Sequence, residues 1–67
     1  MTDPQIKAIT LLRAGWRQRY GINWTDQYDA RADETLIIIL KTRAVDHVYT
    51  LCPNGLLKSK RTLIKES

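Results

Sequence analysis

The chain has 67 residues, and 11 Lys and Arg against 7 Asp and Glu give it a formal net charge of +4 with His47 neutral. This length fits one small domain, residues 1–67, and a hydrophobic fraction of 43% is enough for a packed core. Because Cys52 is the only cysteine and His47 the only histidine, the chain by itself forms neither an internal disulfide nor a structural zinc site.

Residues 3–20 predict an amphipathic helix. Asp3 suits the N-cap and Pro4 the first helical position, where its missing N–H costs nothing. Apolar side chains recur every three or four residues and are expected to face the core: Ile6, Ile9, Leu12, Trp16 and Tyr20. Gly21 suits a helix stop, with Ile22 packing back on the helix.

Strands are expected after the helix. Polar and apolar residues begin to alternate after Gly21, and three consecutive isoleucines favour a pleated strand over a helix. A tight turn with Gly55 at positive φ separates the last two strands. The expected strands are residues 22–28, 35–40, 47–52 and 56–64.

One alternative remains for residues 25–44, where Thr25 or Asp29 is a possible cap for a second helix running through Leu40. The preferred fold class is α+β, with one N-terminal amphipathic helix packed on an antiparallel meander of three to four strands.

Positive charge is concentrated in two segments without acids, residues 7–19 and 58–65. The candidate partner- or phosphate-binding residues are Arg13, Arg17, Arg19, Lys58, Lys60 and Arg61. Trp16 and Tyr20 interleave with the first segment, but their spacing favours the helix core. The acidic residues between positions 22 and 35 are expected to lie near one basic segment and partly neutralise it.

The sequence predicts no catalytic site. His47 and Cys52 are five residues apart on an expected strand, so they face opposite sides and form no dyad. We interpret Cys52 as a small residue at a strand end and His47 as solvated. No serine lies in a G-x-S-x-G context, no glycine-rich loop is present, and the acids lack the spacing of a calcium loop. We therefore expect no enzyme, no metal, no cofactor and no small-molecule substrate.

The isoleucine-rich strand is apolar on both faces: Leu36, Ile38 and Leu40 alternate with Ile37 and Ile39. A single helix covers only one face of a sheet, so the second face is expected to be buried by another chain, by a curled sheet or by the last strand folding over it. The excess of apolar strand surface favours a homodimer or a protein partner, with Ile37, Ile38 and Ile39 as candidate interface residues.

These observations favour a small non-catalytic binding module, a regulator or inhibitor that occludes a partner's surface as small phage or mobile-element inhibitors do. The alternative is a nucleic-acid-binding protein that uses residues 7–19 and 58–65. A protein partner is favoured over DNA or RNA because the acidic segment repels phosphate and no groove-reading helix follows the first helix. We expect a cytoplasmic protein without membrane attachment, since no apolar run approaches the ~20 residues of a membrane span and no signal peptide is evident.

Overall fold

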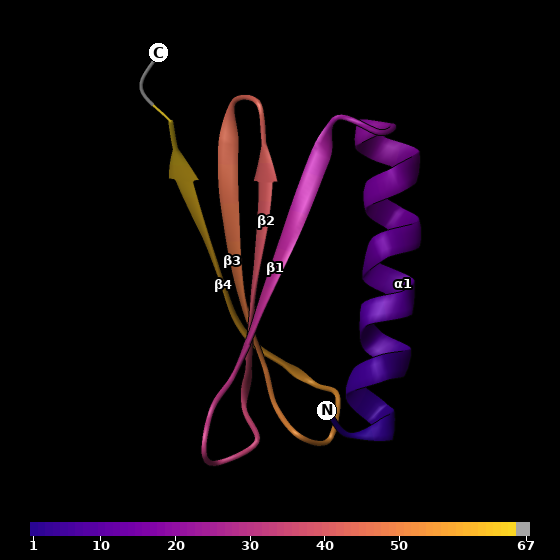
Figure 1. Cartoon of the computed structure of the whole chain (residues 1–67), viewed down its shortest axis with the longest axis vertical. Helices are drawn as coiled ribbons and strands as arrows, with labels where there is room; N and C mark the ends of the chain where they lie inside the picture. The colour runs from indigo at the N-terminus through magenta and orange to yellow at the C-terminus, as the bar shows by residue number, and fades with distance from the viewer. Residues whose placement is uncertain (66–67) are drawn as a thin grey trace.

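A computed structural model describes residues 1–65 and places one helix against one face of a four-stranded antiparallel sheet (Figure 1). The strands are neighbours in chain order, so the sheet is a simple meander. The α+β class and all four strands are confirmed, whereas the alternative helix within residues 25–44 is wrong because a hairpin occupies this stretch. The elements are α1 (Asp3–Tyr20), β1 (Trp24–Ala30), β2 (Leu36–Thr42), β3 (Val45–Leu51) and β4 (Leu57–Ile64).

The start of α1 is a capping box on Thr2, so the prediction of Asp3 as N-cap is wrong. The Thr2 hydroxyl accepts from the Gln5 N–H at 3.2 Å, and the Gln5 side chain accepts from the Thr2 N–H at 2.9 Å. This arrangement satisfies two helix-end donors reciprocally. The side-chain Nε2 of Gln5 also donates to the Glu34 backbone carbonyl at 2.7 Å, which fixes the helix start to the β1–β2 loop.

The buried stripe of α1 is confirmed at Ile9 and Trp16 but not at Ile6, which is 47% exposed. At 100° per residue, Gln5 lies at the centre of the stripe and Ile6 at its edge. Gly21 ends the helix at a φ of 67°. Ile22, expected to pack on the helix, is 90% exposed instead.

Alternation along β2 divides its apolar residues between the two sheet faces, as predicted. Leu36, Ile38 and Leu40 are buried beneath α1, and Ile37 and Ile39 are half-buried on the opposite side, which we call the open face. Ile38 is 0% exposed in the core, so its prediction as an interface residue is corrected. Only Ile37 and Ile39 are accessible to a partner.

The last strand, β4, extends beyond the cover that α1 provides. A helix is about 10 Å wide and strands lie about 4.8 Å apart, so one helix covers only part of a four-stranded sheet. Every residue of β4 is exposed, whereas β2 and β3 contain alternating buried positions. The uncovered part of the helix side therefore lies over β4.

Candidate binding groove between the helix and the last strand

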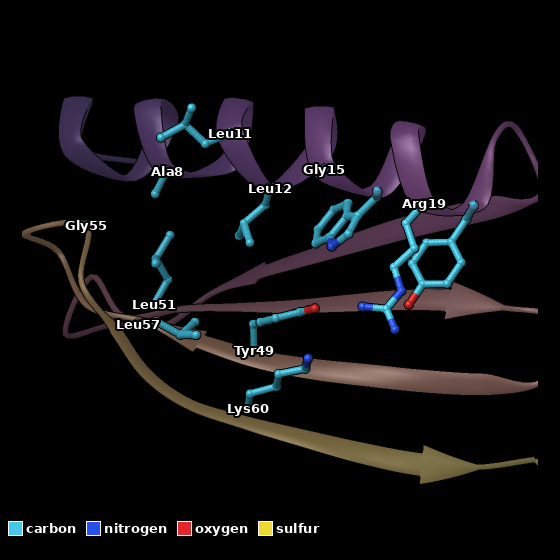
Figure 2. A pocket seen from close by; sticks show the side chains of 12 residues that line it. Ala8, Leu11, Leu12, Gly15, Arg19, Tyr49, Leu51, Gly55, Leu57 and Lys60 are labelled. Carbon is cyan, nitrogen blue, oxygen red and sulfur yellow. The ribbon is translucent and has the colours of Figure 1, made fainter.

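An open groove of about 460 Å³ lies on the helix side of the sheet between α1 and β4 (Figure 2). One end is at Gly55 in the β3–β4 turn and the other at Arg19 and Tyr20 in the last turn of α1. The first end is closed by the helix start, because the Thr2 hydroxyl donates to the Pro53 carbonyl.

The helix wall of the groove follows from residue spacing. Ala8, Leu12 and Arg19 lie at intervals of four and seven residues, which places them on one strip beside the buried stripe. Gly15 belongs to the same strip, and a Cβ built there meets no atom within 4 Å. Leu11 stands at the rim with 75% of its surface exposed. The helix thus presents a low apolar wall to the groove.

The floor and the far wall come from β3 and β4. Tyr49 and Leu51 form the floor and are 6% and 1% exposed. The Tyr49 ring centroid lies 5.7 Å from that of Trp16, so the floor is continuous with the core. Leu57 lines the far wall and is 47% exposed. This half of the groove offers apolar surface to a ligand.

Two cations face the groove from opposite walls: Figure 2 shows Arg19 toward the end of the helix wall and Lys60 beside Tyr49, near the middle of the groove. The Lys60 ammonium lies 5.6 Å from the Tyr49 ring centroid, and the Arg19 guanidinium carbon lies 5.7 Å from that of Tyr20. The lining residues include no acid. In residues 1–65 neither cation forms an ion pair, so the groove carries positive charge that no carboxylate of these residues neutralises.

His47 contacts Tyr20 at the end of the groove and is buried, which corrects its interpretation as a solvated residue. Its ring nitrogens lie 3.4 Å from the Tyr20 hydroxyl and 3.1 Å from that of Thr62. Burial, followed by the charges of Lys60 and Arg19, lowers the pKa of His47 below its usual value. The ring is therefore neutral at pH 7, and Cys52 is not among its hydrogen-bond partners.

The remaining candidate cations are dispersed over the molecule. Arg13 forms an ion pair with Asp26 at 3.7 Å on the β1 side of α1, which confirms partial neutralisation by the acidic segment. Arg17 lies on the same side as Arg13. Arg61 is the cross-strand neighbour of Val48 and therefore lies on the open face, whereas Lys60 lies on the helix side of the sheet.

Of the six predicted cations, only Arg19 and Lys60 line the groove; Lys58 is exposed and lies outside it. Sequence reasoning missed the contribution of Tyr49, Leu12 and Leu57. The sequence feature that could have indicated the groove side of α1 is Gly15, because glycine is unfavourable within a helix. Gly15 lies on the strip of the helix that faces β4.

The described part of the chain contains no cluster of three or more His, Cys, Asp or Glu side chains able to hold a metal ion. None of its helical segments has both the length and the apolar character needed to cross a membrane.

Comparison with known families, curated proteins and solved structures finds no match. The groove and the open face are therefore the features of the described residues that can indicate a function.

Proposed function

We propose that the protein is a small non-catalytic binding module that regulates or inhibits a partner protein by occluding part of its surface. The groove between α1 and β4 receives an apolar segment of that partner, with an acidic side chain beside Arg19 and Lys60. The observation that carries the proposal is the combination of apolar walls with two cations that lack ion-pair partners in residues 1–65. An acidic group provides the complementary charge.

The shape of the groove favours a polypeptide over a small molecule. From Ala8 to Arg19 the helix wall extends for roughly 16 Å at about 1.5 Å per residue. Small-molecule sites enclose most of their ligand, whereas this groove is open to solvent. A short extended or helical segment of a protein fits such a site.

The nucleic-acid alternative receives less support. Arg13 and Lys65, one from each basic segment, already form ion pairs with Asp26 and Asp46. Lys60 and Arg61 lie on opposite sides of the sheet, so one nucleic-acid strand does not contact both easily.

The proposed module is also a homodimer and acts in the cytoplasm, where the lone thiol of Cys52 stays reduced.

The proposal is tested by affinity capture from a lysate of the source cells with three immobilised proteins. They are the wild type, Arg19→Glu/Lys60→Glu, which reverses both groove cations, and Arg17→Glu/Lys58→Glu, which makes the same change in net charge outside the groove. A partner of the groove is retained by the wild type and the control but lost with the groove variant. The purified partner should then bind the groove variant at least about 100-fold more weakly, an effect of ~2.7 kcal/mol.

Two results would contradict the proposal. In the first, every captured protein is retained equally by the groove variant and the control. In the second, all captured proteins are lost with both variants, which indicates attraction to net charge alone. Circular dichroism of the three proteins establishes that they are equally folded.

A further inference from the structure

The open face of the sheet has an aliphatic centre and opposite charges around it. Ile37, Ile39 and Val48 are half-buried there, although an antiparallel sheet that faces solvent is usually polar on that side. The strand register arranges this face in three rows across β1 to β4: Asp29, Ile37, Thr50 and Ser59; Gln27, Ile39, Val48 and Arg61; Thr25, Lys41, Asp46 and Leu63.

We infer that a second copy of the chain covers the open face, related by a two-fold axis that runs parallel to the strands between β2 and β3. The inference rests on the homodimer of the proposed function and adds its surface and orientation. This axis places β2 of one protomer over β3 of the other and keeps each row opposite itself. Ile39 then faces the partner's Val48, and Lys41 faces the partner's Asp46.

Charge selects this orientation over the other two-fold arrangement of two stacked sheets. An axis perpendicular to the strands sets the first row over the third, which places Lys41 against the partner's Ile37. The parallel axis instead brings Lys41 to an acid twice, once in each protomer. Asp46 already has Lys65 at 3.0 Å and Lys41 of its own chain as its cross-strand neighbour, but a carboxylate accepts more than one donor.

Net charge also favours self-association through the open face rather than through the helix. The open face carries two acids, Asp29 and Asp46, and three bases, Lys41, Arg61 and Lys65, so its net charge is only +1 and two copies repel each other little. A second α1 placed in the groove would instead bring its Arg17 and Arg19 toward Arg19 and Lys60. The groove is therefore left for a different, acidic partner.

The area of the face indicates a weak dimer. Four strands about 4.8 Å apart and seven residues long at about 3.3 Å each give a face of roughly 19 by 23 Å. Two such faces bury roughly 900 Å², just below the ~1,000 Å² that a stable specific interface exceeds. Dissociation constants in the micromolar range or above are expected. The two grooves then lie on opposite outer faces, so one dimer can hold two partner molecules.

Analytical ultracentrifugation from about 1 µM to 1 mM should show the 7.8 kDa chain passing from monomer to dimer. Ile39→Asp should weaken association about 100-fold or more, because it places an unpaired charge at the interface centre. Ile22→Asp makes the same change at a residue that is 90% exposed beyond the sheet, and it should leave the dimer intact.

The orientation is tested with two charge-reversed proteins, Lys41→Glu and Asp46→Lys. Each alone should dimerise more weakly than the wild type, because both of its intersubunit pairs become repulsive. Mixed together, they should form a heterodimer in which both pairs are attractive again, and native mass spectrometry separates it from the homodimers by mass.

A wild-type monomer at 1 mM, or an Ile39→Asp protein that dimerises like the wild type, would overturn the open-face dimer. Homodimers and heterodimers in random proportion would overturn the orientation. None of these substitutions touches Arg19 or Lys60. The capture experiment on the groove therefore succeeds or fails independently of this one.

Discussion

Gly55 lies directly against the backbone of Pro4, which joins the start of α1 to the β3–β4 turn. A Cβ built on Gly55 would come within 2.8 Å of the Pro4 carbonyl oxygen. Gly55 also has a φ of +87°, a conformation that side chains with a Cβ rarely adopt. The turn therefore requires glycine for two independent reasons, and it closes one end of the groove.

Gly55→Ala should lower the free energy of unfolding by about 2 kcal/mol or more. The new Cβ strains the backbone at positive φ and clashes with the Pro4 backbone, which is held in place at the helix start. Urea denaturation followed by circular dichroism measures the change. For a domain of this size each kcal/mol corresponds to a shift in Tm of about 4 to 8 °C. An unchanged midpoint would show that the turn and the helix start do not meet in solution.

Gly15→Ala is the matched glycine substitution and should act in the opposite direction. Gly15 lies within α1, and a Cβ there meets nothing within 4 Å. Alanine is favoured over glycine in a helix by about 1 kcal/mol, so the variant should be more stable by up to that amount. A loss of stability would mean that this strip of the helix is in contact with another part of the molecule.

The turn at Gly55 was predictable from sequence because proline, asparagine and glycine each have a local conformational preference. The helix cap could also be predicted, since Thr2 and Gln5 have the spacing of a capping box. The adjacent Asp3 and Pro4, however, favoured Asp3 as the N-cap. The groove could not be predicted from the sequence. It depends on how far one helix extends across four strands, which is set by tertiary packing.

The burial of His47 predicts that stability falls in mild acid. The unfolded chain binds a proton on this ring near pH 6.5, and the folded chain does so only at lower pH. Protonation therefore favours unfolding: the stabilisation present above pH 6.5 is lost as the pH falls through the lower pKa of the folded state. One such group changes the free energy of unfolding by at most about 1.4 kcal/mol per pH unit.

Urea denaturation of the wild type and of His47→Gln at pH 7.5, 6.5 and 5.5 isolates this effect. His47→Gln has its own cost in stability, but between these pH values its stability should vary less than that of the wild type. Equal pH dependence in the two proteins would mean that His47 is accessible for protonation in the folded state.

The burial of His47 was predictable from the alternation of side chains along its strand. His47 is two residues from Tyr49 and four from Leu51, so in one strand all three share a face. Placing the start of β3 at Val45 makes His47 an interior strand residue and therefore a buried one. The adjacent Asp46 was a misleading indication of solvent exposure.

Tyr28 should ionise at unusually high pH. Although Tyr28 is 37% exposed, partial loss of hydration and its hydrogen bond to the Asp26 carboxylate raise its pKa to about 12 from a usual value of 10.0. Asp26→Asn removes the negative charge and should lower this pKa while leaving the contribution of burial. The ultraviolet absorbance of the phenolate measures the titration, and Tyr28→Phe identifies which part belongs to this residue. A titration identical in Asp26→Asn and the wild type would contradict the contact.

Binding of nucleic acid is the measurement that separates the two proposed kinds of partner. Fluorescence anisotropy with labelled DNA and RNA, single- and double-stranded, should be carried out at about 50 and 200 mM salt. Because the cations lie on different sides of the molecule, we expect only weak binding, with dissociation constants of about 10 µM or above at the lower salt. Arg19→Ala, on the helix side, and Arg61→Ala, on the open face, probe the two sides separately.

A nucleic acid bound on the helix side loses a phosphate contact with Arg19→Ala but not with Arg61→Ala. Each lost contact lowers the slope of log K against log salt by about 0.7 to 0.9. Folding stability should change little in either variant, because exposed charges contribute little to it. Tight binding whose slope falls with Arg19→Ala alone would assign the groove to phosphates rather than to an acidic protein segment. Tight binding whose slope falls with Arg61→Ala alone would assign the open face to nucleic acid and conflict with the dimer.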